Sequence, residues 1–256
     1  MSDEIREDLS RTSRLLDMDD VPHLSDAEKR KILRGTPAYQ LQARKSGLPG
    51  HGVGAIYPIP LANMLVDPFL IPGHWPVCAA MDPGWNCTAV AWFAWNMDKG
   101  GAVIFDEYYI GQQHPAVHAA AIRARGHWIP IVIDPAAQKA RGHDGERLLD
   151  VYRDLGLNVM EADNTVVSGI IETWNWLSTS QLKVFRTCVN WQKEVGLYRR
   201  DEKGEIIKRN DHLMDCTRYG VMSGRAVAIV PPASAGGLPW FTWTPEMATQ
   251  GGVWSG

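Results

Sequence analysis

From Trp75 onward, short apolar runs alternate with amphipathic stretches along the chain. Apolar runs bounded by turn residues predict strands, whereas apolar residues spaced three and four apart predict helices. The strands are expected at residues 75–82, 88–96, 102–110, 127–134, 157–163 and 182–185. The helices are expected at residues 114–126, 145–156, 166–179, 188–198 and 211–224. Elements in this order predict an α/β fold with a mixed central sheet flanked by helices.

Two turns add to this prediction. The sequence MDKGG at residues 97–101 predicts a hairpin between the second and third strands. A charged hairpin is expected at residues 198–210, turning at Lys203-Gly204. The pattern also divides the chain into three parts. Residues 1–70 predict a helical and linker arm, residues 71–225 hold the predicted sheet, and residues 226–256 predict a flexible tail rich in Pro, Gly and Trp.

Composition favours an ordinary globular protein. The chain has 256 residues, of which 45% are hydrophobic and 21% charged, and it has no apolar run of the ~18 residues that a membrane helix needs. The four cysteines form no CxxC pair and no zinc-like spacing, which favours free thiols in a cytosol. The net charge of −3 does not favour a strong autonomous binder of nucleic acid. No GxxxxGK[ST] motif occurs, so we expect no P-loop ATP site.

Acidic residues stand where ligands collect in α/β sheets. Asp82 and Asp134 each end an apolar strand, and Asp211, His212 and Asp215 stand at the start of the last predicted helix. If the two strands are neighbours, their carboxylates lie side by side and repel unless a cation neutralises them. Such oxygen ligands suit Mg²⁺ or Mn²⁺, which work in pairs about 3.5–4 Å apart in phosphodiester hydrolysis. Asp82 is the natural bridging ligand.

The helix start leaves a choice of ligands open. Asp211 can serve as a helix N-cap, and Asp215 can pair with Arg218 or Lys208 instead of a metal. We favour Asp215 together with His212, because residues three apart share one face of a helix. Asp211 is kept as a further candidate metal ligand.

Basic residues lie close to these acids in the sequence. They could contact DNA phosphates in register with the acids, or they could simply belong to solvated charged loops. The candidates for DNA binding are Lys139, Arg141, Arg147, Arg200, Lys208 and Arg209.

Five segments carry a resemblance to a known family: MDPGWNCTAVAWFAWN, VIFDEYY, IPIVIDPAAQ, DGERLLDVYRDLGLNVMEADN and YRRDEKGEIIKRNDHLMDCTRYG. In this order, they resemble the C-terminal nuclease domain of the phage terminase large subunit, which is of the ribonuclease H-like, retroviral-integrase-like type. The resemblance spans about residues 70–225. The stretch LSDAEKRKILRGTPAYQLQARKSGLPGHGVGAIYPI is similar to the segment that joins this family's ATPase motor to its nuclease.

The resemblance implies a metal-dependent endonuclease that cuts concatemeric viral DNA, joined end to end, during packaging. It implies Asp82, Asp134 and Asp215 as catalytic residues, with two Mg²⁺ or Mn²⁺ ions held by these acids and by His212 and Asp211. Double-stranded DNA would be the substrate and the host cytoplasm the location, with no membrane involved. The portal, the terminase small subunit and an ATPase motor absent from this sequence would be the partners.

Two alternatives stay open beside the packaging nuclease. A Holliday-junction resolvase or a transposase-like nuclease of the same fold would need the same acids but would act on branched or structured DNA. A non-catalytic packaging module would instead dock onto other components through the tail and the N-terminal helices.

Overall fold

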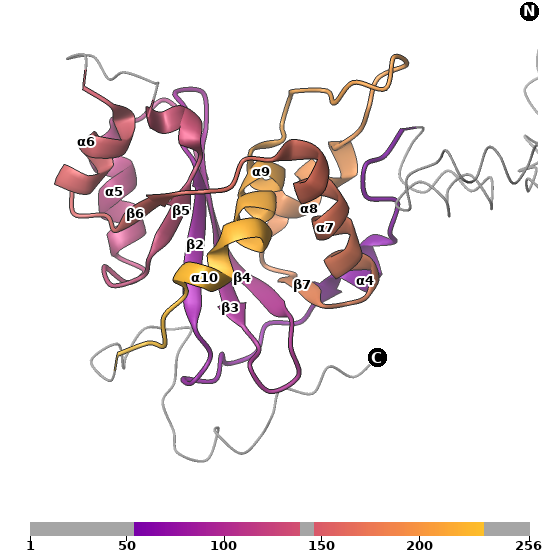
Figure 1. Cartoon of the computed structure of the whole chain (residues 1–256), viewed down its shortest axis with the longest axis horizontal. Helices are drawn as coiled ribbons and strands as arrows, with labels where there is room; N and C mark the ends of the chain where they lie inside the picture. Colours follow the sequence, from indigo (N-terminus) through magenta and orange to yellow (C-terminus); the bar gives the residue numbers. More distant parts are fainter. Residues whose placement is uncertain (1–53, 139–145, 233–256) are drawn as a thin grey trace, which may run out of the picture.

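A seven-stranded sheet forms the centre of the computed structural model, which describes residues 54–138 and 146–232 (Figure 1). The strand order is β1-β7-β4-β3-β2-β5-β6. The strands are β1 (Leu65–Val66), β2 (Val77–Asp82), β3 (Thr88–Trp95), β4 (Ala102–Ile110), β5 (Ile131–Ile133), β6 (Val159–Glu161) and β7 (Leu182–Phe185). The pairs β2–β3 and β3–β4 are antiparallel and the other pairs are parallel, so the sheet is mixed.

Helices pack on both faces of this sheet (Figure 1). They are α4 (Leu61–Met64), α5 (Pro115–Arg123), α6 (Leu148–Asp154), α7 (Val166–Ser178), α8 (Val189–Leu197), α9 (His212–Tyr219) and α10 (Arg225–Val227). A 3₁₀ turn at Pro135–Gln138 follows β5, and a π-helical segment at Gly220–Gly224 joins α9 to α10. The predicted α/β fold, with a mixed sheet flanked by helices, is confirmed.

The central strands are buried on both faces. Every residue of β3 is buried, as are the first five residues of β2, which explains why these strands are continuous apolar runs in the sequence. On one face, Trp92 lies under the guanidinium of Arg125, which follows α5. On the other face, Trp95 packs edge-on against Trp176 of α7. The core therefore lies in two layers, one on each side of the sheet.

Helix α9 lies very close to the sheet because glycines follow it. A Cβ atom on Gly220 would be 2.2 Å from Cζ of Phe93 in β3, and one on Gly224 would be 2.8 Å from Sγ of Cys78 in β2. Only a residue without a side chain fits at these contacts. The two glycines therefore set the depth at which α9 sits against β2 and β3.

Several predicted elements differ from the structure in length. The strand expected at residues 127–134 is only Ile131–Ile133, because Gly126 turns the chain at a φ of 138° and Pro130 has no N–H to donate to a ladder. The helix predicted at residues 211–224 becomes π-helical at Gly220 and continues to Val227. The charged hairpin is reduced to one antiparallel bridge, between Arg200 and Ile206, with the predicted turn at Gly204.

The described residues include the end of the predicted N-terminal arm. Ile56 and Tyr57 are buried in the core, and β1 pairs with β7 at an edge of the sheet. The division at residue 70 stays a prediction, and the helices predicted at residues 25–47 and the tail from residue 233 lie outside the described residues. All four cysteines are buried free thiols. Among the described helices, none has the length and apolar character needed to cross a membrane.

Candidate active site

The acids predicted at two strand ends lie next to each other. Strands β2 and β5 are parallel neighbours, with Met81 in register with Ile133. Asp82 ends β2, and Asp134 follows β5 and donates its backbone N–H to the Met81 carbonyl at 3.1 Å. Because parallel neighbours end at the same edge of a sheet, the two carboxylates emerge together from the core. The expected pairing of these strands is correct.

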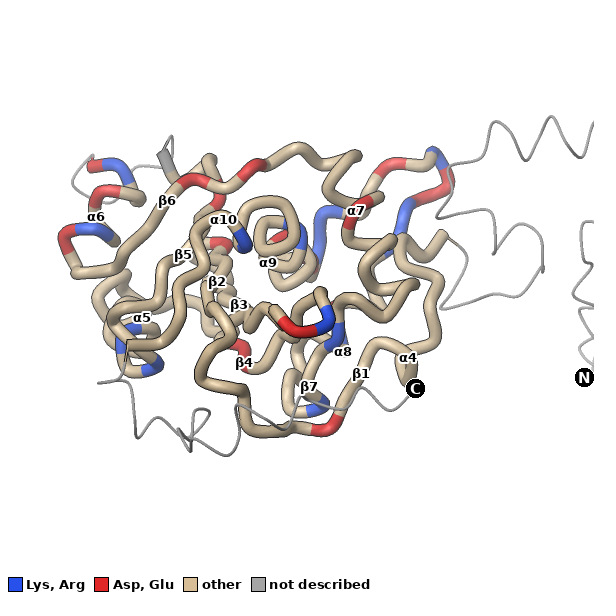
Figure 2. The backbone as a smooth tube through the Cα atoms, turned by 60° about the horizontal axis from the view of Figure 1, so that its bottom comes forward, with Lys and Arg blue, Asp and Glu red and all other residues tan. Residues whose placement is uncertain are grey.

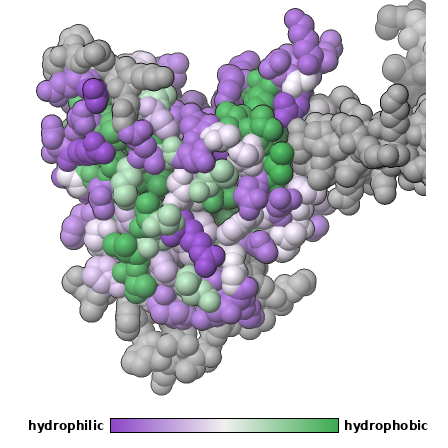
Figure 3. Space-filling model, in the orientation of Figure 1, coloured by the Kyte–Doolittle hydropathy of each residue, from purple (hydrophilic) through white to green (hydrophobic). Residues whose placement is uncertain are grey.

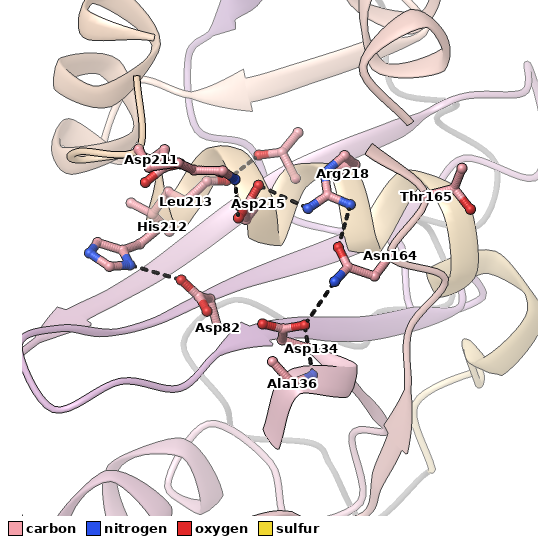
Figure 4. A network of polar contacts seen from close by, with 12 residues as sticks. Asp82, Asp134, Ala136, Asn164, Thr165, Asp211, His212, Leu213, Asp215 and Arg218 are labelled. Atoms are coloured by element: carbon pink, nitrogen blue, oxygen red, sulfur yellow. Dashed lines mark hydrogen bonds and ion pairs between the residues drawn. The ribbon is translucent and has the colours of Figure 1, made fainter. Parts of the chain in front are cut away.

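The start of α9 brings the third group of polar residues to this edge. Nδ1 of His212, the first residue of α9, lies 2.8 Å from Oδ2 of Asp82. Asp215 follows one turn later, and Figure 4 shows Asp82, Asp134 and Asp215 pointing into a common space. Figure 3 shows that this end of the molecule is hollowed between the lobe that carries α6 and the projecting hairpin at residues 199–209. The structure thus brings together the residues favoured from the sequence.

Asp82 and His212 form one electrostatic unit. Burial raises the pKa of the Asp82 carboxyl, the hydrogen bond from His212 opposes this shift, and the nearby charges of Asp215 and Asp134 raise the pKa further. The bond to Asp82 in turn raises the pKa of His212. Because the two groups titrate together, the pair holds its shared proton more firmly than either group would alone. The shift on Asp82 also shows that the three acids are close enough to repel one another.

Asp134 and Asp215 are joined by two further side chains (Figure 4). Asn164, which follows β6, donates from Nδ2 to Oδ1 of Asp134 at 3.2 Å. Arg218 of α9 donates from one nitrogen to Oδ1 of Asn164 and from the other to Oδ1 of Asp215, both at 2.9 Å. The Arg218 side chain is only 1% exposed, so the alternative pairing of Asp215 does occur, but in the interior of the protein.

Asp211 does not act as a side-chain cap. It occupies the N-cap position of α9, yet its carboxylate makes no capping hydrogen bond. The carboxylate lies 3.5 Å from Nζ of Lys208, and that same ammonium lies 3.7 Å from Oδ2 of Asp215. The N-terminus of α9 is capped from another helix, because the buried Glu194 of α8 accepts the Leu213 N–H at 2.6 Å. The capping role expected of Asp211 is therefore wrong.

The donor set of this site suits a hard divalent cation. It consists of carboxylate oxygens from three separate elements, and the crowding of negative charge around Asp82 is what such a cation would relieve. Within the part of the chain that the structure describes, no three His, Cys, Asp or Glu side chains form a ready-made group that could hold a metal ion. Each acid is instead bonded to a nearby donor, so metal binding would require these side chains to exchange partners.

The predicted DNA-binding residues are not gathered into one basic surface. Arg147 precedes α6 and is exposed, whereas Arg200 donates to the Gly204 carbonyl within the hairpin. Lys208 and Arg209 are exposed at the end of that hairpin, beside the start of α9. Figure 2 shows basic and acidic residues interspersed along the described chain. Lys139 and Arg141 lie outside the described residues.

Three polar residues of the site were not selected from the sequence. Asn164 stands after a strand, as Asp134 does, so the strand-end rule could have found it if amides had been considered together with acids. Arg218 was considered only as a surface partner, because the sequence does not reveal that its side chain is buried. Glu194 carries no local signal, since it caps a helix that begins 18 residues later in the chain.

Comparison with known proteins identifies the family, although no family model matches the chain. The solved structure of the phage P22 large terminase nuclease domain matches 70% of this chain and 96% of its own chain, with 31% identity and a TM-score of 0.64. The protein belongs to the phage terminase large-subunit nucleases. The family and the fold expected from the sequence are therefore confirmed.

Two longer terminases also match this terminase nuclease. The terminase large subunit of Salmonella phage P22 is 33% identical over 215 residues, which cover 80% of this chain and 43% of the relative. The large terminase of a thermophilic bacteriophage, solved in complex with ADP, has a TM-score of 0.59 at 22% identity over 81% of this chain and 54% of its own, and shares the fold. The chain thus spans less than half the length of the curated P22 relative.

Proposed function

We propose that this terminase nuclease is an endonuclease that cuts concatemeric, double-stranded viral DNA during genome packaging, using two divalent metal ions. The observation that carries the proposal is the convergence of Asp82, Asp134 and Asp215, from two neighbouring strand ends and one helix, on a single hollow. The membership of the chain in the terminase nuclease family supports the same activity.

Mg²⁺ or Mn²⁺ would be held by Asp82, Asp134 and Asp215, with His212 and Asp211 as further ligands. When bound, such ions supply an activated water and stabilisation of the leaving oxygen, so that one water is added across a phosphodiester bond. Asp82 would stand between the two ions, because it lies between Asp134 on the adjacent strand and His212 on α9. The rigid core strand that ends at Asp82 fixes its position.

The residues around the acids would hold and orient the substrate. His212 keeps the Asp82 carboxylate in one orientation through its bond from Nδ1. The exposed Arg147, Lys208 and Arg209 would contact phosphates at the rim of the hollow, as would Arg200 and the loop residues Lys139 and Arg141. Because phosphate contacts carry no sequence information, we infer that cutting has little sequence preference.

We further propose that the nuclease works in the host cytoplasm beside an ATPase motor, the portal and the terminase small subunit. The support is the P22 relative, which is a terminase large subunit and of which this chain spans 43%. The nuclease would comprise residues 71–225, with residues 1–70 connecting it to the motor and residues 226–256 forming a tail.

A plasmid-nicking assay tests the nuclease activity. The purified chain should nick and linearise supercoiled DNA with Mn²⁺ or Mg²⁺, and EDTA should abolish cutting. Asp82→Asn and Asp134→Asn should each lower the rate by about 100-fold or more, because a carboxylate at the reacting centre is lost. Asp154→Asn, an exposed position on α6, is the matched control and should cut at the normal rate.

Other outcomes would point to other functions. Cutting that persists in EDTA would refute metal catalysis. Equal background activity in the wild type and in both site variants would favour the non-catalytic packaging module. A strong preference for four-way junctions over linear duplexes would favour the resolvase alternative.

A further inference from the structure

Arg218 is a charged side chain in the interior of the protein. Its side chain is only 1% exposed, and it stands on α9 one turn after Asp215. Burying a guanidinium is costly unless its donors are bonded to acceptors, and one of its nitrogens meets the Asp215 carboxylate at 2.9 Å. An ion pair with Asp215 alone would account for only part of this arrangement, because the guanidinium has a second bonded partner.

The second partner extends the contact to another strand. Arg218 donates to Oδ1 of Asn164 at 2.9 Å, and Nδ2 of Asn164 donates to Oδ1 of Asp134 at 3.2 Å. One chain of hydrogen bonds therefore runs from Asp215 on α9 to Asp134 after β5 (Figure 4). These two acids are 81 residues apart in the sequence, and the chain of bonds crosses the site between them.

We propose that Arg218, acting through Asn164, is a positioning residue that sets the spacing of Asp134 and Asp215, and through that spacing the affinity of the site for divalent metal. The inference rests on the proposed function, since it takes these two acids as metal ligands. Partners of this kind, which orient a ligand without touching the metal, change metal affinity or activity by about 10–100-fold when they are removed.

Packing holds the guanidinium in this position. Gly169 of α7 faces the aliphatic part of Arg218 so closely that a Cβ there would lie 2.5 Å from Cγ and 2.7 Å from Cδ. The centre of the guanidinium lies 4.6 Å from the centroid of the Tyr219 ring. With one side against a glycine and the other against an aromatic ring, Arg218 has little freedom to turn away from its two acceptors.

The fork shape of arginine is what this role requires. A planar guanidinium offers donors in two fixed directions, here toward Asn164 and Asp215, whereas a lysine ammonium is a single point of charge. Lysine at this position would keep a positive charge near Asp215 but would lose the link to Asn164. Charge compensation and positioning can therefore be separated by substitution.

The experiment measures Mn²⁺ binding to the full chain by isothermal titration calorimetry without DNA, together with thermal unfolding of the metal-free protein and plasmid nicking. Asn164→Ala breaks the link at an exposed residue, so the metal-free melting temperature should stay unchanged while Mn²⁺ affinity falls about 10–100-fold. Arg218→Lys should lower Mn²⁺ affinity by at least as much. Asn175→Ala, on α7 and outside this chain of bonds, should match the wild type.

A third variant moves Arg218 without removing a polar group. Gly169→Ala collides with Cγ and Cδ of Arg218, and it should weaken Mn²⁺ binding in the same direction as Asn164→Ala. If Asn164→Ala and Arg218→Lys bind Mn²⁺ as the wild type does, the inference is overturned and the proposed function stands. The inference is also overturned if Arg218→Lys lowers only the melting temperature. If the wild type itself neither binds Mn²⁺ nor cuts DNA, the proposed function fails and the inference fails with it.

Discussion

Replacing Gly220 by alanine tests whether the close approach of α9 to the sheet determines both stability and activity. The backbone at Gly220 is helical, with φ −59° and ψ −49°, so alanine suits the local conformation. The obstacle is tertiary, because the new Cβ would lie 2.2 Å from Cζ of Phe93 and within 3 Å of both Cε atoms. Phe93 is fully buried in β3 and cannot move aside.

Two opposing terms decide the magnitude. Alanine in a helix is favoured over glycine by about 0.8–1.0 kcal/mol. Inserting a methyl group into a packed core costs about 1–3 kcal/mol, and contact with three ring atoms places this case at the upper end of that range. We therefore expect Gly220→Ala to lower the free energy of unfolding by about 1–2 kcal/mol. Because α9 carries His212 and Asp215, the same displacement should slow metal-dependent nicking.

A double-mutant cycle with Phe93→Leu isolates the cause. Leucine has no Cε or Cζ atoms, so all three ring atoms that meet the new methyl are removed. In the Phe93→Leu background, Gly220→Ala should be neutral or stabilising by up to about 1 kcal/mol, which gives a coupling energy of about 1–3 kcal/mol. Equilibrium urea unfolding of the four proteins measures these values. An equal loss in both backgrounds would refute the collision with Phe93 as the reason.

Two further predictions concern groups outside the site. Glu107 accepts the backbone N–H groups of Asn190 and Trp191 at 2.8 Å each, so Glu107→Ala should destabilise the protein by about 1–2 kcal/mol in urea unfolding, and Glu107→Gln by less; an equal cost for both would contradict this capping role. Burial lowers the pKa of His118, whose Nδ1 lies 2.8 Å from the hydroxyl of Tyr108. The unfolded chain therefore binds a proton near pH 6.5 that the folded protein does not bind, so stability is full above this pH and is lost as the pH falls through the lowered folded pKa. In unfolding titrations from pH 8 to pH 5, His118→Gln should lose less stability than the wild type, and identical pH profiles would contradict the assignment.

Local patterns accounted for most of the secondary structure. The continuous apolar runs of β2 and β3 and the MDKGG turn predicted the central hairpin in its observed place. The prediction was less accurate where a tertiary contact or a single residue overrode the pattern. Pro130 shortened β5, and the packing of Gly220 against Phe93 accompanies the change from α-helix to π-helix, neither of which an apolar pattern reveals.

For the site, the sequence by itself determined which acids stand at strand ends and at a helix start, because strand ends and helix starts are set by residues close together in the chain. Only the tertiary structure decided what those acids meet. His212 reaches Asp82 across 130 residues, Asn164 links Asp134 to Arg218, and Glu194 caps α9 in place of Asp211. The physical reason is that hydrogen-bond partners and the burial of a charge depend on which distant segments pack together, and a local pattern of apolar and polar residues does not specify that packing.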